Sequence, residues 1–281
     1  MSTLDQDSSR HLVLEAGRGD RQYWLDLWRY RELFFILAWR DVSVRYKQTV
    51  IGIVWAVMRP FVTMVVFTVI FGSLAKLPSE GTAPYAVMVF AGLLPWMLFS
   101  SVLTDASSSV VGNANLITKV YFPRLIVPLS TVVVGLIDFL VSLAILAGLM
   151  LWYGVVPGWQ ILLLPVFVVL ALLAGIGPAV WAAAVIVRYR DFRFIIPFAT
   201  QIGLYVSPVG FSSKVVPPAW ELLYSVNPMV GVIDGFRWCI LGGDSPIYWP
   251  GFLISLLVII GMLAWGAHSF RRTERAFADV I

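Results

Sequence analysis

Long runs of apolar residues, separated by short polar stretches, dominate the chain from about residue 52 onward. A helix needs roughly 20 such residues to cross the hydrocarbon core of a bilayer, which is about 30 Å thick. Because every backbone polar group must be paired inside that core, apolar runs of this length favour spanning helices. The pattern predicts an all-α integral membrane protein with six transmembrane helices, at residues 52–74, 85–104, 126–151, 160–187, 194–211 and 248–268.

Composition and charge support this class and predict an orientation. The chain has 59% hydrophobic and 13% charged residues with a mean hydropathy of +0.86, which excludes an ordinary soluble domain. Sixteen of the 20 Lys and Arg residues fall on the side of the two termini in a six-span topology, so both termini are expected in the cytosol. The net charge of +4 therefore reflects the orientation in the membrane and does not indicate a nucleic-acid-binding surface. We expect a cytosolic N-terminus over residues 1–51, a transmembrane domain over 52–268 and a cytosolic tail over 269–281.

The segment before the first span is predicted to form an amphipathic interface helix. Apolar residues recur at helical spacing, although Arg31 interrupts the stripe: Trp24, Leu27, Trp28, Phe35, Ala38, Trp39, Val42 and Tyr46. Arg29, Arg40 and Asp41 lie away from it, so the helix suits the cytosolic surface of the membrane with its tryptophans at headgroup depth. It either anchors the chain or takes part in gating or lipid access.

Two polar segments on the predicted cytosolic side are candidates for partner binding. In residues 104–119, Asp105 or a nearby serine is a candidate cap for a short helix that would present Leu116 and Ile117 on the surface. An ordinary connecting loop is the alternative. Residues 188–193 (RYRDFR) are either a docking turn or the usual positive flank of a span.

The predicted outer side carries one long irregular segment, residues 215–243. Pro217-Pro218 and Asn227-Pro228 each precede a short apolar stretch, near 218–225 and 229–241. Both stretches are too short to span, so they are predicted to be re-entrant or outer-leaflet helices that shape an exit. A plain extracytoplasmic loop is the alternative.

Catalytic and nucleotide-binding signatures are not found in the sequence. The two histidines, His11 and His268, lie near opposite ends, Cys239 is the single cysteine, and no carboxylate pair has a recognisable spacing. No metal site is predicted, and the chain is not expected to be an enzyme. It has no Gly-Lys dipeptide, so it lacks the loop with which many ATPases hold phosphates, and any ATP energy must come from another chain.

Two ionisable residues lie inside predicted spans. Arg59 is expected about two turns from the cytosolic end, where it either reaches back to the headgroups or faces a vestibule that receives an anionic headgroup. Asp138 lies in the middle of the third span, and either a hydrogen bond between helices or a place in a substrate path accounts for it.

Residues 39–60, WRDVSVRYKQTVIGIVWAVMRP, resemble the membrane subunits of type 2 ABC exporters for polysaccharides, the Wzm-like permeases of O-antigen, capsule and teichoic acid export. The matching pattern consists of Arg40, Asp41, Arg45, Tyr46, Lys47, Gly52, Trp55 and Pro60. Further matches are Asn115-Leu116-Ile117 with Lys119, Tyr121-Phe122-Pro123-Arg124, Arg188 to Asp191, Ser207-Pro208-Val209 and Asn227-Pro228. The resemblance runs from about residue 25 to the end. One departure is Gln48-Thr49, where the family pattern has a small hydroxyl residue before leucine-glycine.

The resemblance implies a homodimer with two copies of a separate ABC ATP-binding subunit on its cytosolic face. ATP and Mg²⁺ would be bound by that partner, with no cofactor on this chain. The implied coupling residues are Arg40, Asp41, Arg45, Asn115, Leu116, Ile117, Arg188, Arg190 and Asp191.

The resemblance also implies a substrate path along the dimer interface, built from the first, second and fifth spans. Aromatic rings give flat surfaces on which sugars can stack. The candidates are Trp55, Arg59, Phe61, Phe67, Phe71, Phe90, Trp96, Phe99 and Tyr205, with an outer gate at Pro217, Pro218, Trp220, Asn227 and Pro228.

The implied function is ATP-driven export of polyprenyl-linked, O-antigen-like polysaccharide across the bacterial inner membrane. The implied partners are the second copy, the ATPase, the glycan and membrane lipid, with no nucleic acid. The alternatives are another type 2 ABC cargo (capsule, teichoic acid, a drug or a lipid), a membrane enzyme acting on polyprenyl-linked sugars, and a scaffold for glycan assembly.

Overall fold

The computed structural model describes residues 20–47, 50–81, 83–242, 245, 247–274 and 277 of the chain. All regular secondary structure in this part is helical. Five segments are long and apolar enough to cross a membrane: Val57–Leu74, Tyr85–Gly112, Ile126–Tyr153, Trp159–Arg188 and Trp249–Glu274. The structure therefore confirms an all-helical, multi-pass membrane protein, with five segments that match five of the predicted spans.

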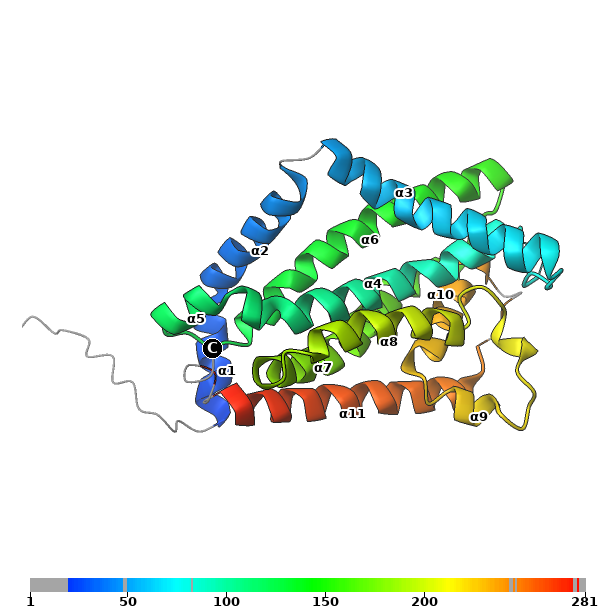
Figure 1. Cartoon of the computed structure of the whole chain (residues 1–281). Coiled ribbons are helices and arrows are strands. Elements are labelled where there is room, and N and C mark those ends of the chain that lie inside the picture. Colours follow the sequence, from blue (N-terminus) through cyan, green and yellow to red (C-terminus); the bar gives the residue numbers. More distant parts are fainter. Residues whose placement is uncertain are drawn as a thin grey trace, which may run out of the picture.

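The long helices lie side by side (Figure 1). They are α3 (Val50–Phe67), continued by the π-helix η1 (Thr68–Leu74), α4 (Tyr85–Gly112), α6 (Ile126–Tyr153), α7 (Leu164–Arg188), preceded by the 3-10 helix η2 (Trp159–Leu163), and α11 (Trp249–Glu274). In α4, 72% of the apolar stretch is buried inside the protein, against 17% to 33% in the other four segments. α4 is therefore the central helix, and the others present most of their apolar surface outward.

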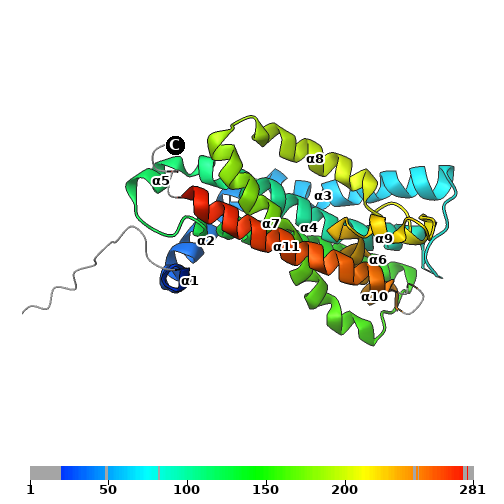
Figure 2. The same cartoon turned by 90° about the horizontal axis from the view of Figure 1, so that it is seen from below.

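The predicted fifth span is shorter than expected. α8 (Phe192–Val206) has 15 residues, which corresponds to about 22 Å and is less than the bilayer core. It ends because Ser207 takes an extended conformation with ψ 153° before Pro208, and a proline ring disfavours the helical conformation in the residue that precedes it. Figure 2 shows α8 beside the central helices, on the side opposite α6.

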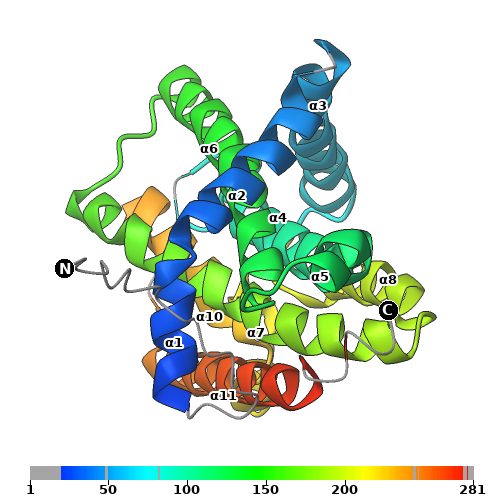
Figure 3. The ribbon, with the colours of Figure 1, turned by 90° about the vertical axis from the view of Figure 1, so that its left-hand side faces the viewer.

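The N-terminal segment forms two helices instead of the single predicted one. α1 (Asp20–Arg29) and α2 (Arg31–Tyr46) are separated at Tyr30. The face that packs on the bundle is also offset from the predicted stripe, because it consists of Tyr23, Leu27, Tyr30, Leu33, Phe34 and Leu37. Much of the predicted stripe points away from the protein: Trp24, Trp28, Phe35 and Trp39 are exposed. α1 and α2 run across the end of the bundle (Figure 3), so these outward rings suit the headgroup region.

α1 is fastened to the last turn of α11. The Arg271 guanidinium lies 4.7 Å from the centre of the Tyr23 ring, and the backbone N–H of Arg124 donates to Glu274 Oε1 at 2.8 Å. Burial and the neighbouring Glu274 carboxylate raise the pKa of Tyr23. The end of α11 therefore joins α1 to the turn that enters α6.

Residues 104–119 do not form a loop with a capped helix. α4 continues to Gly112, and the short helix α5 (Ala114–Lys119) starts only after Asn113, whose side chain makes no capping bond. The serine-rich stretch stays helical because its hydroxyls donate to carbonyls one turn back, as Ser107 does to Thr104 O at 2.9 Å and Ser109 to Ala106 O at 2.7 Å. Asp105 therefore lies inside α4 rather than at a cap.

The opposite end of the molecule contains the 3-10 turn η3 (Ser213–Val215), α9 (Glu221–Tyr224) and α10 (Pro228–Leu241). Pro228 occupies the first turn of α10 as predicted, and the Asn227 side chain accepts from Met229 N–H at 3.0 Å. α10 is mostly buried among α4, α7 and α11. α9 is shorter than the predicted 218–225 stretch, because Pro217 and Pro218 belong to the turn before it.

A buried arginine that the sequence analysis did not single out holds this end together. Arg237 of α10 is fully buried, and its guanidinium donates to the carbonyls of Val209 and Phe211, both at 2.9 Å. It also pairs with Glu80, Nη1 to Oε1 at 3.3 Å, and Glu80 accepts from the Ser245 hydroxyl. A buried charge is tolerated only with such partners. Arg237 therefore fixes three connecting segments onto α10.

Candidate functional site

A cavity of about 860 Å³ lies beside α4, between α3, α6 and α8. Figure 3 shows the arrangement of these elements: α4 stands at the centre, and the three others lie around one side of it. The cavity is therefore a product of the central position of α4, and no single span forms it alone.

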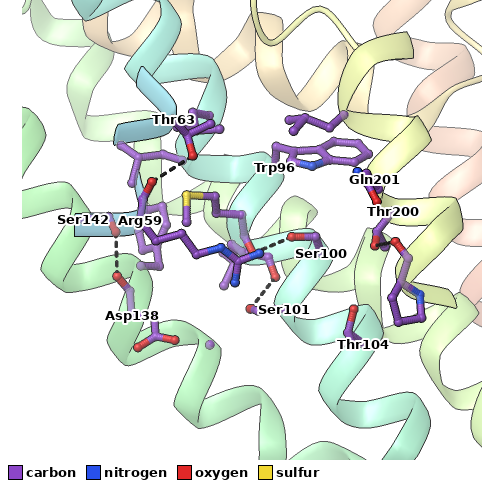
Figure 4. A pocket seen from close by; sticks show the side chains of 18 of the residues that line it. Arg59, Thr63, Trp96, Ser100, Ser101, Thr104, Asp138, Ser142, Thr200 and Gln201 are labelled. Atoms are coloured by element: carbon purple, nitrogen blue, oxygen red, sulfur yellow. Dashed lines mark hydrogen bonds between the residues drawn. The ribbon is translucent and has the colours of Figure 1, made fainter. Parts of the chain in front are cut away.

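Hydroxyl groups form much of its wall (Figure 4). On α4, Ser100, Ser101 and Thr104 recur at a spacing that puts them on one helix face. Further small uncharged polar side chains come from the facing helices: Thr63 of α3, Ser142 of α6, and Thr200 and Gln201 of α8.

Most of these hydroxyls donate a hydrogen bond to a backbone carbonyl of their own helix. Ser100 donates to Met97 O at 3.2 Å, Ser101 to Leu98 O at 3.1 Å and Ser142 to Asp138 O at 2.9 Å. Thr63 and Thr200 make the same kind of bond, each at 2.8 Å. A hydroxyl oxygen keeps acceptor capacity after donating its proton. The wall is therefore stable without a ligand and offers acceptors to one.

Five of the nine predicted path residues line this cavity: Trp55, Arg59, Phe67, Trp96 and Tyr205. The others do not. Phe90 is fully buried in the core, Phe61 is exposed on α3, Phe71 packs edge-on against Phe67 at 5.4 Å, and Phe99 packs on Trp96 at 5.2 Å. The structure therefore brings about half of the predicted aromatic set to one place.

The Trp96 ring packs against α8 at Gly203. A Cβ atom at Gly203 would lie 2.6 Å from the Trp96 ring, closer than real Cβ contacts are. The absence of a side chain at Gly203 thus lets the edge of the six-membered indole ring approach the α8 backbone. Because Trp96 also lines the cavity, the position of this ring affects the width of the cavity there.

A cluster of charged side chains forms one edge of the cavity. Arg45 of α2 reaches Asp138 of α6, Nη2 to Oδ2 at 2.5 Å, and Asp105 of α4, Nη1 to Oδ2 at 3.5 Å. The Tyr46 hydroxyl also donates to Asp138. Arg59 lies on the same cavity wall, in the view that also shows Asp138 (Figure 4). Asp138 thus has its partner on α2, a pairing that sequence reasoning missed.

Arg45 therefore lies at the edge of the cavity, unlike the other predicted coupling residues. Arg40 donates to Asp41 Oδ1 at 2.7 Å and to Asn113 Oδ1 at 2.8 Å, which joins α2 to the turn before α5. Asn115 is exposed and Leu116 half-buried, whereas Ile117 is buried, contrary to its predicted surface position. It packs in a cluster with Leu37 because its side of α5 faces the bundle.

The remaining predicted residues divide between the two ends of the bundle. Arg188, Arg190 and Asp191 are exposed at the end that carries α1, α2 and α5. The predicted gate residues are at the other end, where Trp220 is exposed and Asn227 Nδ2 donates to Ser207 Oγ at 2.9 Å. Pro217, Pro218 and Pro228 flank α9. Among the described residues, no group of three or more His, Cys, Asp and Glu side chains is arranged to hold a metal ion.

Comparisons with known proteins identify the family. The chain is 28% identical to the O-antigen export system permease protein RfbA of Myxococcus xanthus over 91% of this chain and 98% of that protein. It is 24% identical to the protein of the same name from Klebsiella pneumoniae, over 89% and 95%, and 22% identical to the polysialic acid transport protein KpsM of Escherichia coli, over 73% and 79%. The family model described as ABC-2 type transporter matches residues 32–241. The chain therefore belongs to the ABC-2 type transporter family.

Proposed function

We propose that this chain is the membrane subunit of an ATP-driven exporter that moves lipid-linked, O-antigen-like polysaccharide out of the cytosol across the bacterial inner membrane. The observation that carries the proposal is the cavity within the bundle, whose wall combines hydroxyls with aromatic rings. Two relatives that match this chain over nearly their whole length are named O-antigen export permeases, which supports the same cargo class.

The proposed topology has six crossings with both termini in the cytosol. α8 runs back along the bundle in the direction required of a fifth crossing (Figure 1), and the proline-containing turn after it would complete the passage. The clustering of Lys and Arg at the α1 and α5 end supports a cytosolic assignment for that end. The α9 and α10 end would then face outward.

The lining suits a sugar polymer. Sugar hydroxyls would donate hydrogen bonds to the acceptor oxygens of Ser100, Ser101 and Thr104, while the exposed Trp55 and Tyr205 offer flat faces for stacking. Such contacts repeat along a polymer without one tight fit, which allows sliding. Arg59, at the cytosolic edge, would receive the anionic phosphate group that links a glycan to its lipid.

The proposed assembly is a homodimer with two copies of an ABC ATP-binding subunit. α3 leaves most of its apolar surface uncovered, and the second copy would cover it so that each cavity opens toward the dimer axis. The exposed Asn115, Arg190 and Asp191 would contact the partner, which would bind ATP and Mg²⁺. This chain would add no cofactor of its own.

The test is reconstitution of the purified chain with its ATPase in sealed vesicles that carry polyprenyl-linked glycan on the ATP-accessible face. Movement of glycan to the other face should require ATP and both subunits. Movement of another cargo but not glycan would replace the proposed cargo within the same class. Chemical modification of the glycan by the chain alone, without ATP, would overturn the exporter proposal in favour of an enzyme.

A further inference from the structure

A second cavity, of about 270 Å³, lies at the α9 and α10 end. Much of its polar lining comes from three elements, with Ser213 and Lys214 of η3, Glu221 and Tyr224 of α9, and Asp234 of α10, and from Tyr248 just before α11. This volume lies just below the range of about 300 to 1,000 Å³ that is typical of drug-sized ligands. The cavity therefore suits one small ring rather than an extended molecule.

Hydrogen bonds between different elements hold the walls in place. The Tyr224 hydroxyl donates to Val206 O at the end of α8 at 2.8 Å. The Ser255 hydroxyl of α11 donates to Ser225 O at 2.9 Å, and a Cβ at Gly251 would lie only 2.3 Å from Ser225 Oγ. α8, α9 and α11 are thus in direct contact around the cavity. A pre-formed wall reduces the entropy lost on binding a ligand.

The side chains fit a polyhydroxylated ring. The carboxylates of Glu221 and Asp234 accept hydrogen bonds and the Lys214 ammonium donates them, while Tyr224 and Tyr248 add ring faces. Burial raises the pKa of the Asp234 carboxyl to about 7, so near neutral pH this group is present both as an acceptor and as a donor to a hydroxyl.

Other ligand classes fit the cavity less well. Glu221 and the partly ionised Asp234 offset the charge of Lys214, so the lining has no excess of positive charge to favour phosphate or other anions. The described residues supply no third carboxylate, histidine or cysteine for a metal ion. The ligand class that remains is a neutral or amino-substituted sugar.

We propose that this cavity binds one sugar unit of the exported glycan on the outer side of the membrane. The proposal rests on the export function above and adds a site to it. The two cavities are adjacent along α8: Leu204 and Tyr205 line the first, and the carbonyl of the next residue, Val206, accepts from Tyr224 in the second. A glycan that leaves the first cavity along α8 therefore meets the second, which would hold the emerging end and oppose backward sliding.

The experiment uses spheroplasts that express the full transporter, so that an added probe reaches only the outer face. The probe is an oligosaccharide of one to three repeats, prepared from the surface glycan of the source cell and carrying a photoreactive diazirine. Crosslinked peptides are identified by mass spectrometry, and excess unlabelled oligosaccharide should compete. We expect crosslinks within residues 213–248, reduced at least tenfold by Tyr248→Ala and by Asp234→Asn.

Trp249→Ala is the matched control, because Trp249 is an exposed aromatic next to Tyr248 that does not line the cavity. It should leave labelling unchanged. Labelling that is absent, or equal in all variants, while glycan export proceeds would overturn the sugar site and leave the proposed function standing. Failure of the unaltered transporter to export glycan would instead overturn the proposed function and this inference with it. The Tyr248 side chain is half-exposed, so Tyr248→Ala should fold. It therefore tests the site even if Asp234→Asn does not fold.

Discussion

Arg45 and Asp138 lie 93 residues apart in the chain, yet their charged atoms meet at 2.5 Å on the edge of the cavity. The side chains are 43% and 21% exposed, so the pair is partly screened by solvent. The Tyr46 hydroxyl adds a second bond to the same carboxylate. Together they hold the end of α2 on α6, and an apolar-run analysis cannot find such a pairing because it depends on tertiary folding.

A double-mutant cycle with Arg45→Gln and Asp138→Asn tests this pair. Each single change should lower the thermal unfolding midpoint, and the two should combine to less than their sum, with a coupling of about 0.5 to 1 kcal/mol because the pair is partly exposed. The control is Asp26→Asn in the exposed Arg29–Asp26 pair of α1, which should change little. Strictly additive effects would show that Arg45 and Asp138 do not stabilise each other.

Gly203→Ala tests the contact between α8 and Trp96. The added methyl group would fall 2.6 Å from the indole, so the ring must turn into the cavity and narrow it. We expect glycan export to fall severalfold at unchanged protein level. Gly261→Ala in α11 is the matched control, because its methyl group would meet no atom within 4 Å. Equal export in both variants would contradict a role of this contact in setting the cavity width.

At the scale of elements, apolar run length predicted five of the long helices because a bilayer sets a minimum length. Sequence polarity was a poor guide to their ends. Ser107 and Ser109 suggested a loop but stay helical by bonding to their own backbone, which extends α4 to Gly112. Conversely, Ser207 directly precedes Pro208 in the sequence, and α8 does end there. Local chemistry thus predicts helix ends only where the backbone itself is constrained.

Arg237 is the residue on which the α9 and α10 end depends, and its replacement tests this. Arg237→Met leaves Glu80 buried without its cation, for which a cost of about 3 to 5 kcal/mol is typical. We expect a clear drop in the thermal unfolding midpoint and faster proteolysis of residues 207–248 from the outer side. The double variant Arg237→Met with Glu80→Gln should recover part of the loss. An unchanged midpoint in the single variant would show that this buried pair does not stabilise the fold.

At the scale of the whole molecule, composition and apolar run length predicted the membrane class, whereas the path residues implied by the family resemblance match the cavity wall only in part. The search for stacking surfaces selected aromatic residues, four of which lie outside the cavity. The hydroxyls of Ser100, Ser101 and Thr104 were overlooked inside an apolar span. Polar side chains within a span usually face the protein interior, so their spacing was an available signal.

The exposed residues at the α1 and α5 end lead to a prediction about assembly. Asn115 and Arg190 are exposed and make no contact that the fold needs, whereas Ile117 is buried and its replacement would disturb packing as well as docking. Asn115→Glu combined with Arg190→Glu should therefore release the ATP-binding subunit without lowering the thermal unfolding midpoint of the membrane subunit. Co-purification from native membranes measures the release, and glycan export should fall in proportion. Lys214→Glu, at the opposite end, is the charge-reversal control for co-purification, because it lies away from the proposed docking surface. Retention of the partner by the Asn115 and Arg190 double variant would place the docking surface elsewhere and break the proposed link between α5 and ATP hydrolysis.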